Sequence, residues 1–368
     1  MIPGPIEFDD QVLSAMGHFS VAHTAQPFVD TFSDTLKKLR QLFLVSDPEA
    51  QPFVVAGGGT LGWDLSAANF VTKGDKVLVL STGFFSDSWA KAFEAYGVEV
   101  TVVKAEIGDV TPQDQVAAAL KAASYKAVTI TQVDTSTAVL QDVKALSALV
   151  HEVSPETLVF VDGVCSIGVE EFRFSDWGID YVLTAPQKAI GAPAGLSISV
   201  ASKRALARLN EIPPAGFYSD LRRWLPIMIA YEAGKPAYFS TPAIQNIYAL
   251  HEALNQCATS EEAVYDRLKQ HKEASDKFKD ALAAIGIKLL AKNRAVAAHG
   301  LTAAYLPDGV ELPSLTKPML EHGFVIAGGI LPPIAAKYFR VGHMGVSVTK
   351  YGYADKITEV LPQVLSQL

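Results

Sequence analysis

The sequence has few of the features that mark secreted, membrane-spanning or nucleic-acid-binding proteins. Its only 2 cysteines, Cys165 and Cys257, match no paired-thiol motif, so we expect a reducing compartment and no disulfide framework. No apolar run approaches the roughly 20 residues that a membrane-spanning helix needs. The formal net charge is -8, and the chain contains no block of Lys and Arg. Nucleic acid and anionic membranes are therefore not expected partners.

Targeting signals and metal motifs are also scarce. Met1 to Pro5 contain no basic residue and no apolar stretch, so we expect no signal or transit peptide and a cytoplasmic location. The ending Ser366-Gln367-Leu368 resembles the peroxisomal Ser-Lys-Leu address only loosely, which leaves a peroxisomal location as the alternative. The 8 histidines form no His-Glu-x-x-His motif, so we expect no catalytic metal site.

The sequence does contain a regular α/β pattern. Short apolar runs rich in β-branched residues alternate with segments that carry apolar residues at helical spacing. This alternation predicts a mostly parallel sheet covered by helices. The expected strands are Lys76–Ser81, Val98–Val103, Lys126–Thr131, Thr157–Asp162 and Tyr181–Thr184, and the expected helices are Asp87–Tyr96, Pro112–Ala123 and Asp142–His151.

After about Ile247 the pattern changes to that of a smaller α+β unit. We therefore divide the chain into a large domain, residues 1–250, whose first 15 or so residues form an N-terminal arm, and a small domain, residues 251–368. The Pro- and Gly-rich stretch Ile212–Thr241 is long enough to be functional rather than a simple connection. In the small domain we expect helices at Ser260–Ala284, Leu315–His322 and Asp355–Leu368, and strands at Ile287–Ala291 and Leu301–Leu306.

Three features could carry chemistry. Gly57-Gly58-Gly59-Thr60 follows an apolar run and opens a helical pattern, so its N–H groups could bind a phosphate; such a cluster is otherwise a tight turn. Asp162 ends an expected strand, where ligands of α/β sheets bind, although an isolated Asp is usually a cap or turn residue. Lys188 follows the next strand among small and apolar neighbours. Burial would lower its pKa, as Schiff-base chemistry requires, whereas a lone Lys is usually a solvated surface residue.

These segments together resemble the alanine–glyoxylate and serine–pyruvate aminotransferases, which are class V aminotransferases among the fold-type I pyridoxal-phosphate enzymes. The fungal alanine–glyoxylate enzymes are the most similar. The resemblance is nearly end to end and implies an aspartate-aminotransferase-like fold, with a large sheet of the seven-stranded type. It is carried by Pro3-Gly-Pro5, Gly57-Gly-Gly-Thr60, Asp134-Thr-Ser-Thr137, Val161-Asp-Gly-Val164, Gln187-Lys188, Tyr238-Phe-Ser-Thr241 and Phe339-Arg-Val-Gly342.

The resemblance implies a role for each matching residue. Lys188 would form the Schiff base with pyridoxal 5'-phosphate and later shuttle a proton, while Asp162 would keep the pyridine nitrogen protonated. Phosphate contacts are implied for Gly58, Gly59, Thr60 and Gln187, and for Tyr238 and Thr241 from the partner subunit of a homodimer. Ser136 would lie near the ring oxygen and Val164 against one ring face. Phe85 stands where relatives often stack a Trp, although a role in the core is nearly as well supported.

Arg340 completes the implied site. A guanidinium suits a bidentate grip on the α-carboxylate of a substrate, whereas an isolated Arg in such a position is usually part of a surface ion pair. The expected reaction is transamination in two half-reactions, from alanine to glyoxylate, which yields pyruvate and glycine and so serves glycine biosynthesis. Serine–pyruvate and serine–glyoxylate transamination are the alternatives. A cysteine desulfurase is disfavoured because Cys257 lies in a helical context, and a non-catalytic scaffold would need none of Lys188, Asp162 and Arg340.

Overall fold

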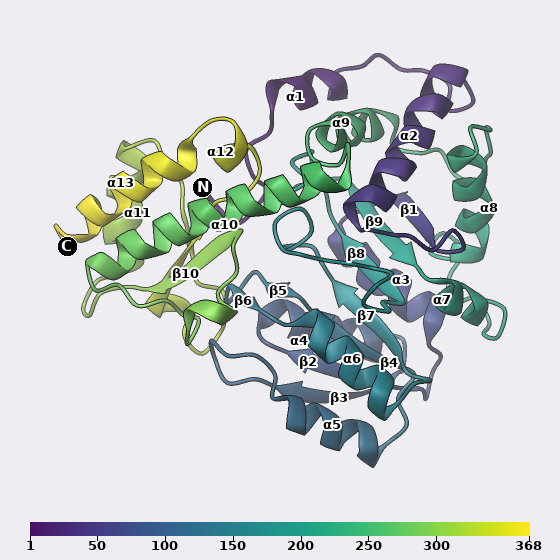
Figure 1. Ribbon diagram of the computed structural model, residues 1–368, viewed down its shortest axis with the longest axis horizontal. Coiled ribbons are helices and arrows are strands. Elements are labelled where there is room, and N and C mark those ends of the chain that lie inside the picture. The colour runs from purple at the N-terminus through teal and green to yellow at the C-terminus, as the bar shows by residue number, and fades with distance from the viewer.

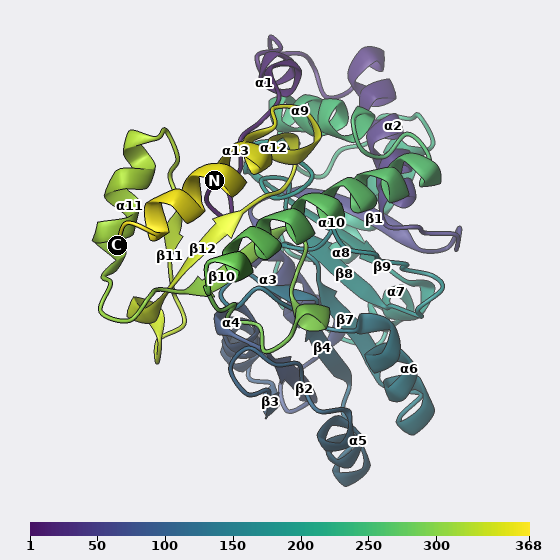
Figure 2. The same ribbon diagram turned by 60° about the vertical axis from the view of Figure 1, so that its left-hand side comes forward.

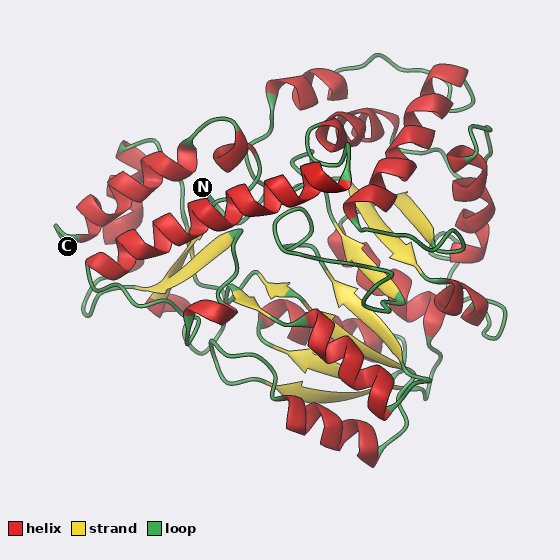
Figure 3. Cartoon of the chain, viewed as in Figure 1, coloured by secondary structure: helices red, strands yellow, loops and turns green.

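A large, mostly parallel sheet with helices on both faces forms the greater part of the chain, and a small antiparallel sheet lies beside it (Figures 1 and 3). This is a computed structural model, which describes every residue from Met1 to Leu368. No helix combines the length and the apolar character needed to cross a membrane. The expected α/β class is confirmed.

The large sheet has 7 strands in the order β1-β9-β8-β7-β4-β2-β3. Neighbours from β8 to β3 are parallel, and β9 is antiparallel to both β8 and β1. Strands such as β4 and β7 are buried along their whole length, because helices cover both faces and only continuous apolar runs suit that position. The strands are β1 (Gln51–Ala56), β2 (Lys76–Ser81), β3 (Glu99–Lys104), β4 (Ala127–Thr131), β7 (Leu158–Asp162), β8 (Tyr181–Thr184) and β9 (Leu196–Ala201).

The covering helices pack their apolar faces into the core of the large sheet. Several begin at a polar cap: the Asp142 carboxylate accepts a 2.9 Å hydrogen bond from the Ala145 N–H at the start of α6. A short hairpin of β5 (Val133–Asp134) and β6 (Val139–Leu140) extends beyond β4. The helices are α1 (Asp10–Met16), α2 (Gln26–Leu42), α3 (Gly59–Phe70), α4 (Phe84–Ala95), α5 (Gln113–Ala122), α6 (Val143–Val153), α7 (Lys203–Arg208), α8 (Leu221–Glu232) and α9 (Ile244–Asn255).

The small sheet has the order β10-β12-β11 and is antiparallel throughout. The long helix α10 leads to it from the large sheet (Figures 1 and 2). Its elements are α10 (Glu261–Ala284), β10 (Leu301–Tyr305), α11 (Leu312–Glu321), β11 (Ala327–Gly328), β12 (Tyr338–Gly342), α12 (Val346–Thr349) and α13 (Tyr353–Leu365). The division after residue 250 stays a prediction; α9 spans this position and packs into the core of the large sheet.

Two segments differ from the sequence-based expectation. Helix α8 lies within the Pro- and Gly-rich stretch 212–241, because Asp220 caps it and apolar residues such as Trp224 and Met228 recur on its buried side. The expected strand Ile287–Ala291 is reduced to one bridge, between Leu289 and Ala304. The remaining expected elements are present within a few residues of their expected bounds.

Candidate active site

Asp162 and Lys188 lie at the same edge of the large sheet. Asp162 is the last residue of β7, and the register pairs it with Leu183 on the neighbouring parallel strand β8. Lys188 lies in the turn that follows β8. Because parallel strands end on the same side of a sheet, the carboxylate and the amine reach one region, although 26 positions separate them in the sequence (188 − 162 = 26).

The Asp162 carboxylate is buried and held by two donors. The indole Nε1 of Trp63 donates to Oδ2 at 2.9 Å, and the N–H of Val164 donates to Oδ1 at 2.9 Å. Burial raises the pKa of Asp162 to about 6, although these hydrogen bonds and the charge of Lys188 act in the opposite direction. A carboxylate in this state would be stabilised by a cationic partner, and the chain places none in direct contact with it.

The Lys188 amine is largely enclosed. Its Nζ donates to the backbone carbonyl of Pro3, and Cys165 lies close enough to influence its titration. Burial lowers the pKa of Lys188, and the positive charge of Arg340 acts in the same direction. A lower pKa raises the fraction of free amine, which is the form that attacks carbonyl carbons.

The N-terminus of α3 supplies free donors beside this pair. The N–H groups of Gly58, Gly59 and Thr60 have no acceptor within the chain, and no side chain caps the helix. A Cβ placed on Gly58 would meet nothing within 4 Å, so the space before it is open. Free N–H groups and the helix dipole make this terminus suitable for an anion.

Val164 lies against the start of α3, and Gln187 directly precedes Lys188. A Cβ placed on Gly59 would lie 3.0 Å from Cγ2 of Val164, so this side chain packs against the helix start. The buried Oε1 of Gln187 has no hydrogen-bond partner. Orphaned buried polar atoms are uncommon, and they indicate a missing partner such as water or a ligand.

Phe85, in the first turn of α4, and Ser136, in the turn between β5 and β6, lie on neighbouring segments that hydrogen bonds join. The ring of Phe85 is half-buried, with its centroid 6.5 Å from that of Trp63. The Ser136 hydroxyl donates to Asp134 at 2.6 Å and accepts from the N–H of Phe84 at 2.9 Å. Its single proton is therefore already used, and any contact from Ser136 to a ligand would use its remaining acceptor capacity.

Arg340 extends from β12 of the small sheet towards the same region. Its Nε donates to the carbonyl of Gly328 at 2.9 Å, and Nη1 donates to the carbonyl of Thr135 at 3.1 Å. No acceptor within the chain bonds Nη2. The two backbone contacts hold the guanidinium in position, and its side chain meets no carboxylate, so it is not an ordinary surface ion pair.

Within one chain, the side chains of Tyr238 and Thr241 form no hydrogen bond to the Lys188 site. Tyr238 is 63% exposed, and its ring packs against His23 at 5.0 Å. Neither side chain makes a hydrogen bond within the chain. Two exposed polar side chains without partners are compatible with a contact to another copy.

Sequence reasoning missed the residues that support the site from a distance. Trp63 holds Asp162 from 99 positions away, and Tyr338 donates to the Ser136 carbonyl at 2.7 Å across 202 positions. Asp134 accepts from the N–H groups of Phe85 and Ser86 at 3.1 and 3.0 Å. The only sequence signal for these partners is their presence in or beside the segments that carry the family resemblance.

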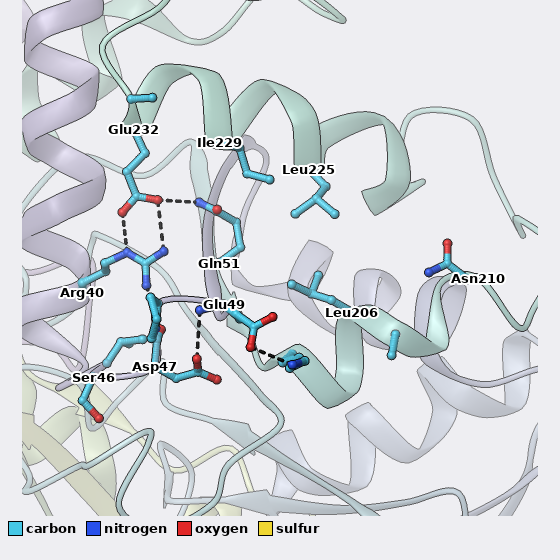
Figure 4. A pocket seen from close by; sticks show the side chains of 15 residues that line it. Arg40, Ser46, Asp47, Glu49, Gln51, Leu206, Asn210, Leu225, Ile229 and Glu232 are labelled. Atoms are coloured by element: carbon cyan, nitrogen blue, oxygen red, sulfur yellow. Dashed lines mark hydrogen bonds and ion pairs between the residues drawn. The ribbon is translucent and has the colours of Figure 1, made fainter.

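A surface hollow of about 930 Å³ lies elsewhere, between α2, α7 and α8 (Figure 4). Its charged groups bind one another: Nη2 of Arg40 donates to Glu232 at 3.1 Å, Gln51 donates to the same carboxylate at 3.0 Å, and Lys203 pairs with Glu49 at 2.7 Å. The hollow therefore offers few free groups for chemistry, in contrast to the Lys188 region.

Comparisons with known proteins agree with this geometry. The family model described as aminotransferase class-V matches residues 9–329. The chain is 48% identical to an alanine–glyoxylate aminotransferase of Saccharomyces cerevisiae, over 94% of the chain and 92% of that protein. It is 29% identical to a serine–glyoxylate aminotransferase of Methylorubrum extorquens, over 94% and 85% of the two chains. The solved structure of an alanine–glyoxylate aminotransferase from Nostoc sp. superposes with a TM-score of 0.90 at 27% identity, covering 99% of this chain and 94% of that one. On these grounds the chain belongs to the class V aminotransferases, a family that depends on pyridoxal phosphate.

Proposed function

We propose that this aminotransferase binds pyridoxal 5'-phosphate through Lys188 and transfers the amino group of alanine to glyoxylate. The single observation that carries the proposal is the meeting of three groups at one sheet edge. A buried lysine amine with a lowered pKa, a buried carboxylate with a raised pKa and the open N-terminus of α3 lie together there. The naming of the yeast relative supports alanine and glyoxylate as substrates.

The residues present fit the cofactor. Free N–H groups of Gly58, Gly59 and Thr60 suit its phosphate, and Gln187 would contribute through its Nε2 donor, since its Oε1 can only accept a hydrogen bond. The unpaired, buried Asp162 carboxylate suits a protonated pyridine nitrogen, because a cation beside it would remove the cost of its burial. When bound, the cofactor supplies a cationic ring that stabilises negative charge on the substrate Cα.

The chain's own groups then have distinct tasks. Asp162, fixed by Trp63 and Val164, keeps a proton on the ring nitrogen. Val164 would pack against one face of the ring and Phe85 would stack on the other, with Ser136 near its oxygen. Lys188 carries a proton to or from the substrate Cα, for which its Nζ must lie within about 3 Å of the proton that it transfers.

Arg340 selects and orients the substrate. The unbonded Nη2 and the remaining Nη1 proton form a fork that can accept a carboxylate in bidentate fashion. Its two backbone contacts fix the guanidinium in advance, so less conformational entropy is lost on binding. Holding the carboxylate sets the Cα–H towards Lys188.

A homodimer completes the proposal. Tyr238 and Thr241 are exposed and make no side-chain hydrogen bond in the single chain. We assign them to the phosphate of the partner subunit, which would complete each site. The cytoplasmic location and the peroxisomal alternative stay predictions.

Serine is the second candidate donor, because a relative named serine–glyoxylate aminotransferase matches 94% of the chain. A desulfurase reaction is less well supported. It needs a mobile cysteine, and both Cys165 and Cys257 are 2% exposed or less. Relatives below 25% identity support the fold alone.

The deciding experiment is a donor and acceptor panel. The purified, cofactor-loaded protein is incubated with alanine or serine and with glyoxylate or pyruvate, and the products are identified by mass. We expect pyruvate and glycine from alanine and glyoxylate, with the highest kcat/KM of the panel. Sulfide release from cysteine without transamination, or no turnover of any pair, would contradict the proposal.

We expect Arg340→Met to lower kcat/KM for alanine by about 100-fold to 1,000-fold, because loss of a charge-assisted contact to a desolvated carboxylate costs roughly 3–4 kcal/mol. Visible absorbance of the bound cofactor should persist, since Arg340 does not hold it. Arg294→Met is the matched control. Arg294 forms ion pairs with Asp276 and Asp280 of α10 on the protein surface. Equal losses in both variants would show that the effect is not specific to the carboxylate.

A further inference from the structure

The first six residues run between the substrate-binding strand and the lysine. We call Met1–Ile6 the strap. The N–H of Gly342, two positions after Arg340 on β12, donates to the Met1 carbonyl at 2.9 Å, and the N–H of Ile6 donates to the Gln187 carbonyl at 3.1 Å. The N-terminus accordingly lies beside β12 in Figure 2.

The middle of the strap touches the reactive amine. The Pro3 carbonyl accepts the hydrogen bond from Nζ of Lys188, and Pro3 itself is buried. Gly4 has a φ of +112°, and a Cβ placed on it would lie 2.5 Å from Cδ and 2.8 Å from Nζ of Lys188. A side chain at this position would strain the backbone, and its Cβ would require the end of the Lys188 side chain to shift.

This position borders the substrate. If Lys188 transfers a proton at the substrate Cα, its Nζ must approach that atom to within about 3 Å. The strap atoms that contact Nζ would then lie close to the substrate Cα as well. Arg340 lies on the strand to which the strap is anchored and would hold the carboxylate, so the strap would border the reacting carbon beside Nζ of Lys188.

We propose that the strap is the wall that limits the side chain of the amino donor to about one or two heavy atoms, through the Pro3 carbonyl and the Gly4 backbone. This inference rests on the proposed function and specifies its substrate class: alanine and serine fit, and longer aliphatic amino acids do not. The wall is backbone, which cannot change rotamer to admit a longer side chain. Discrimination of about 10-fold or more for each added methylene is the size expected of such a wall.

Simple carboxylates test the wall without catalysis. Acetate, propanoate and pentanoate lack an amine and stand for glycine, alanine and norvaline. Calorimetry with the cofactor-loaded protein gives the Kd of each. In the wild-type chain we expect pentanoate, with two more methylenes, to bind about 100-fold more weakly than propanoate. In a chain that begins at Pro5, prepared so that its initiator Met is removed and position 4 stays empty, the Ile6 anchor is kept and the two affinities should agree within 3-fold.

Gly4→Ala moves the same wall inward, whereas shortening the chain removes it. If the shortened chain does not fold, the Gly4→Ala result alone decides whether the inference holds. The added methyl should weaken propanoate at least 10-fold and acetate less than 3-fold. Glu7→Gln, exposed and just outside the strap, is the control and should leave all three affinities unchanged. Unchanged Kd ratios in both strap variants, or equal weakening of acetate and propanoate in Gly4→Ala, overturn the inference.

The same variants separate this inference from the proposed function. Failure of the proposed function appears as no turnover of alanine by the wild-type chain, and the carboxylate ratios still decide whether the wall exists. Failure of the strap alone appears as unchanged ratios in a chain that does turn over alanine. With an intact function, the shortened chain should also raise kcat/KM for norvaline relative to alanine at least 10-fold.

Discussion

Lys188→Ala is expected to remove transamination almost completely, by at least about 10,000-fold in kcat. The side chain has two proposed tasks, attachment of the cofactor and proton transfer at Cα, and loss of a general base alone costs up to about 10,000-fold. The visible absorbance of the lysine-bound cofactor should disappear at the same time. Absorption spectra of the reconstituted protein and single-turnover product analysis measure the two effects separately.

A second buried lysine provides a sharp control. Burial also lowers the pKa of Lys279, to about 8, but its Nζ is already bonded to Ser275 at 2.7 Å and to the carbonyl of Ala298. Lys279→Gln should therefore keep the cofactor absorbance and most of the turnover. If Lys188→Ala stayed yellow while Lys279→Gln lost its colour, the result would show that Lys279 carries the cofactor and would contradict the proposal.

Asp162→Asn is expected to lower kcat about 1,000-fold. An amide cannot supply the negative charge that keeps the ring nitrogen protonated, and breaking a buried ion pair by removing one partner costs about 3–5 kcal/mol. Cofactor affinity should fall as well. Steady-state kinetics at saturating cofactor separates the effect on chemistry from the effect on binding.

Asp162→Asn lowers activity, but it should make the cofactor-free protein more stable relative to the wild type as the pH rises. The folded pKa of Asp162 is raised from 3.8 to about 6, so between these values the cofactor-free folded state holds a proton that the unfolded state has lost. The contribution of Asp162 to the free energy of unfolding is therefore present at low pH and lost as pH rises through 6. The variant lacks this loss. Its free energy of unfolding minus that of the wild type should rise by about 2 kcal/mol from pH 4 to pH 7.

Urea unfolding of the cofactor-free proteins at pH 4, 5, 6 and 7 measures this difference. Asp142→Asn is the matched control, because Asn caps a helix about as well as Asp and the site lies elsewhere. A flat difference across this pH range for Asp162→Asn would show that the carboxyl is not held in the raised state that the proposal requires.

Sequence patterns predicted much of the sheet because local chemistry decides those parts. Lys76–Ser81 and Tyr181–Thr184 were expected as strands and have these bounds in the structure, since a continuous apolar, β-branched run suits a strand covered on both faces. Helix α8 shows the limit of this reasoning. The sequence predicted only that this Pro- and Gly-rich stretch is functional, and the buried face of the helix is evident only once Trp224 and Met228 are seen in the core.

For the site, too, some features could be predicted from the sequence and others required the tertiary structure. The chemical groups could be read from the sequence: an amine after β8, a carboxylate at the end of β7 and glycines at the start of α3. Tertiary structure alone decided that Trp63 holds Asp162, that the Pro3 carbonyl meets Lys188 and that Arg340 reaches the same region from the small sheet. These contacts join segments 99 to 185 positions apart. No local pattern encodes them, because strand order and the packing of the small sheet bring the partners together.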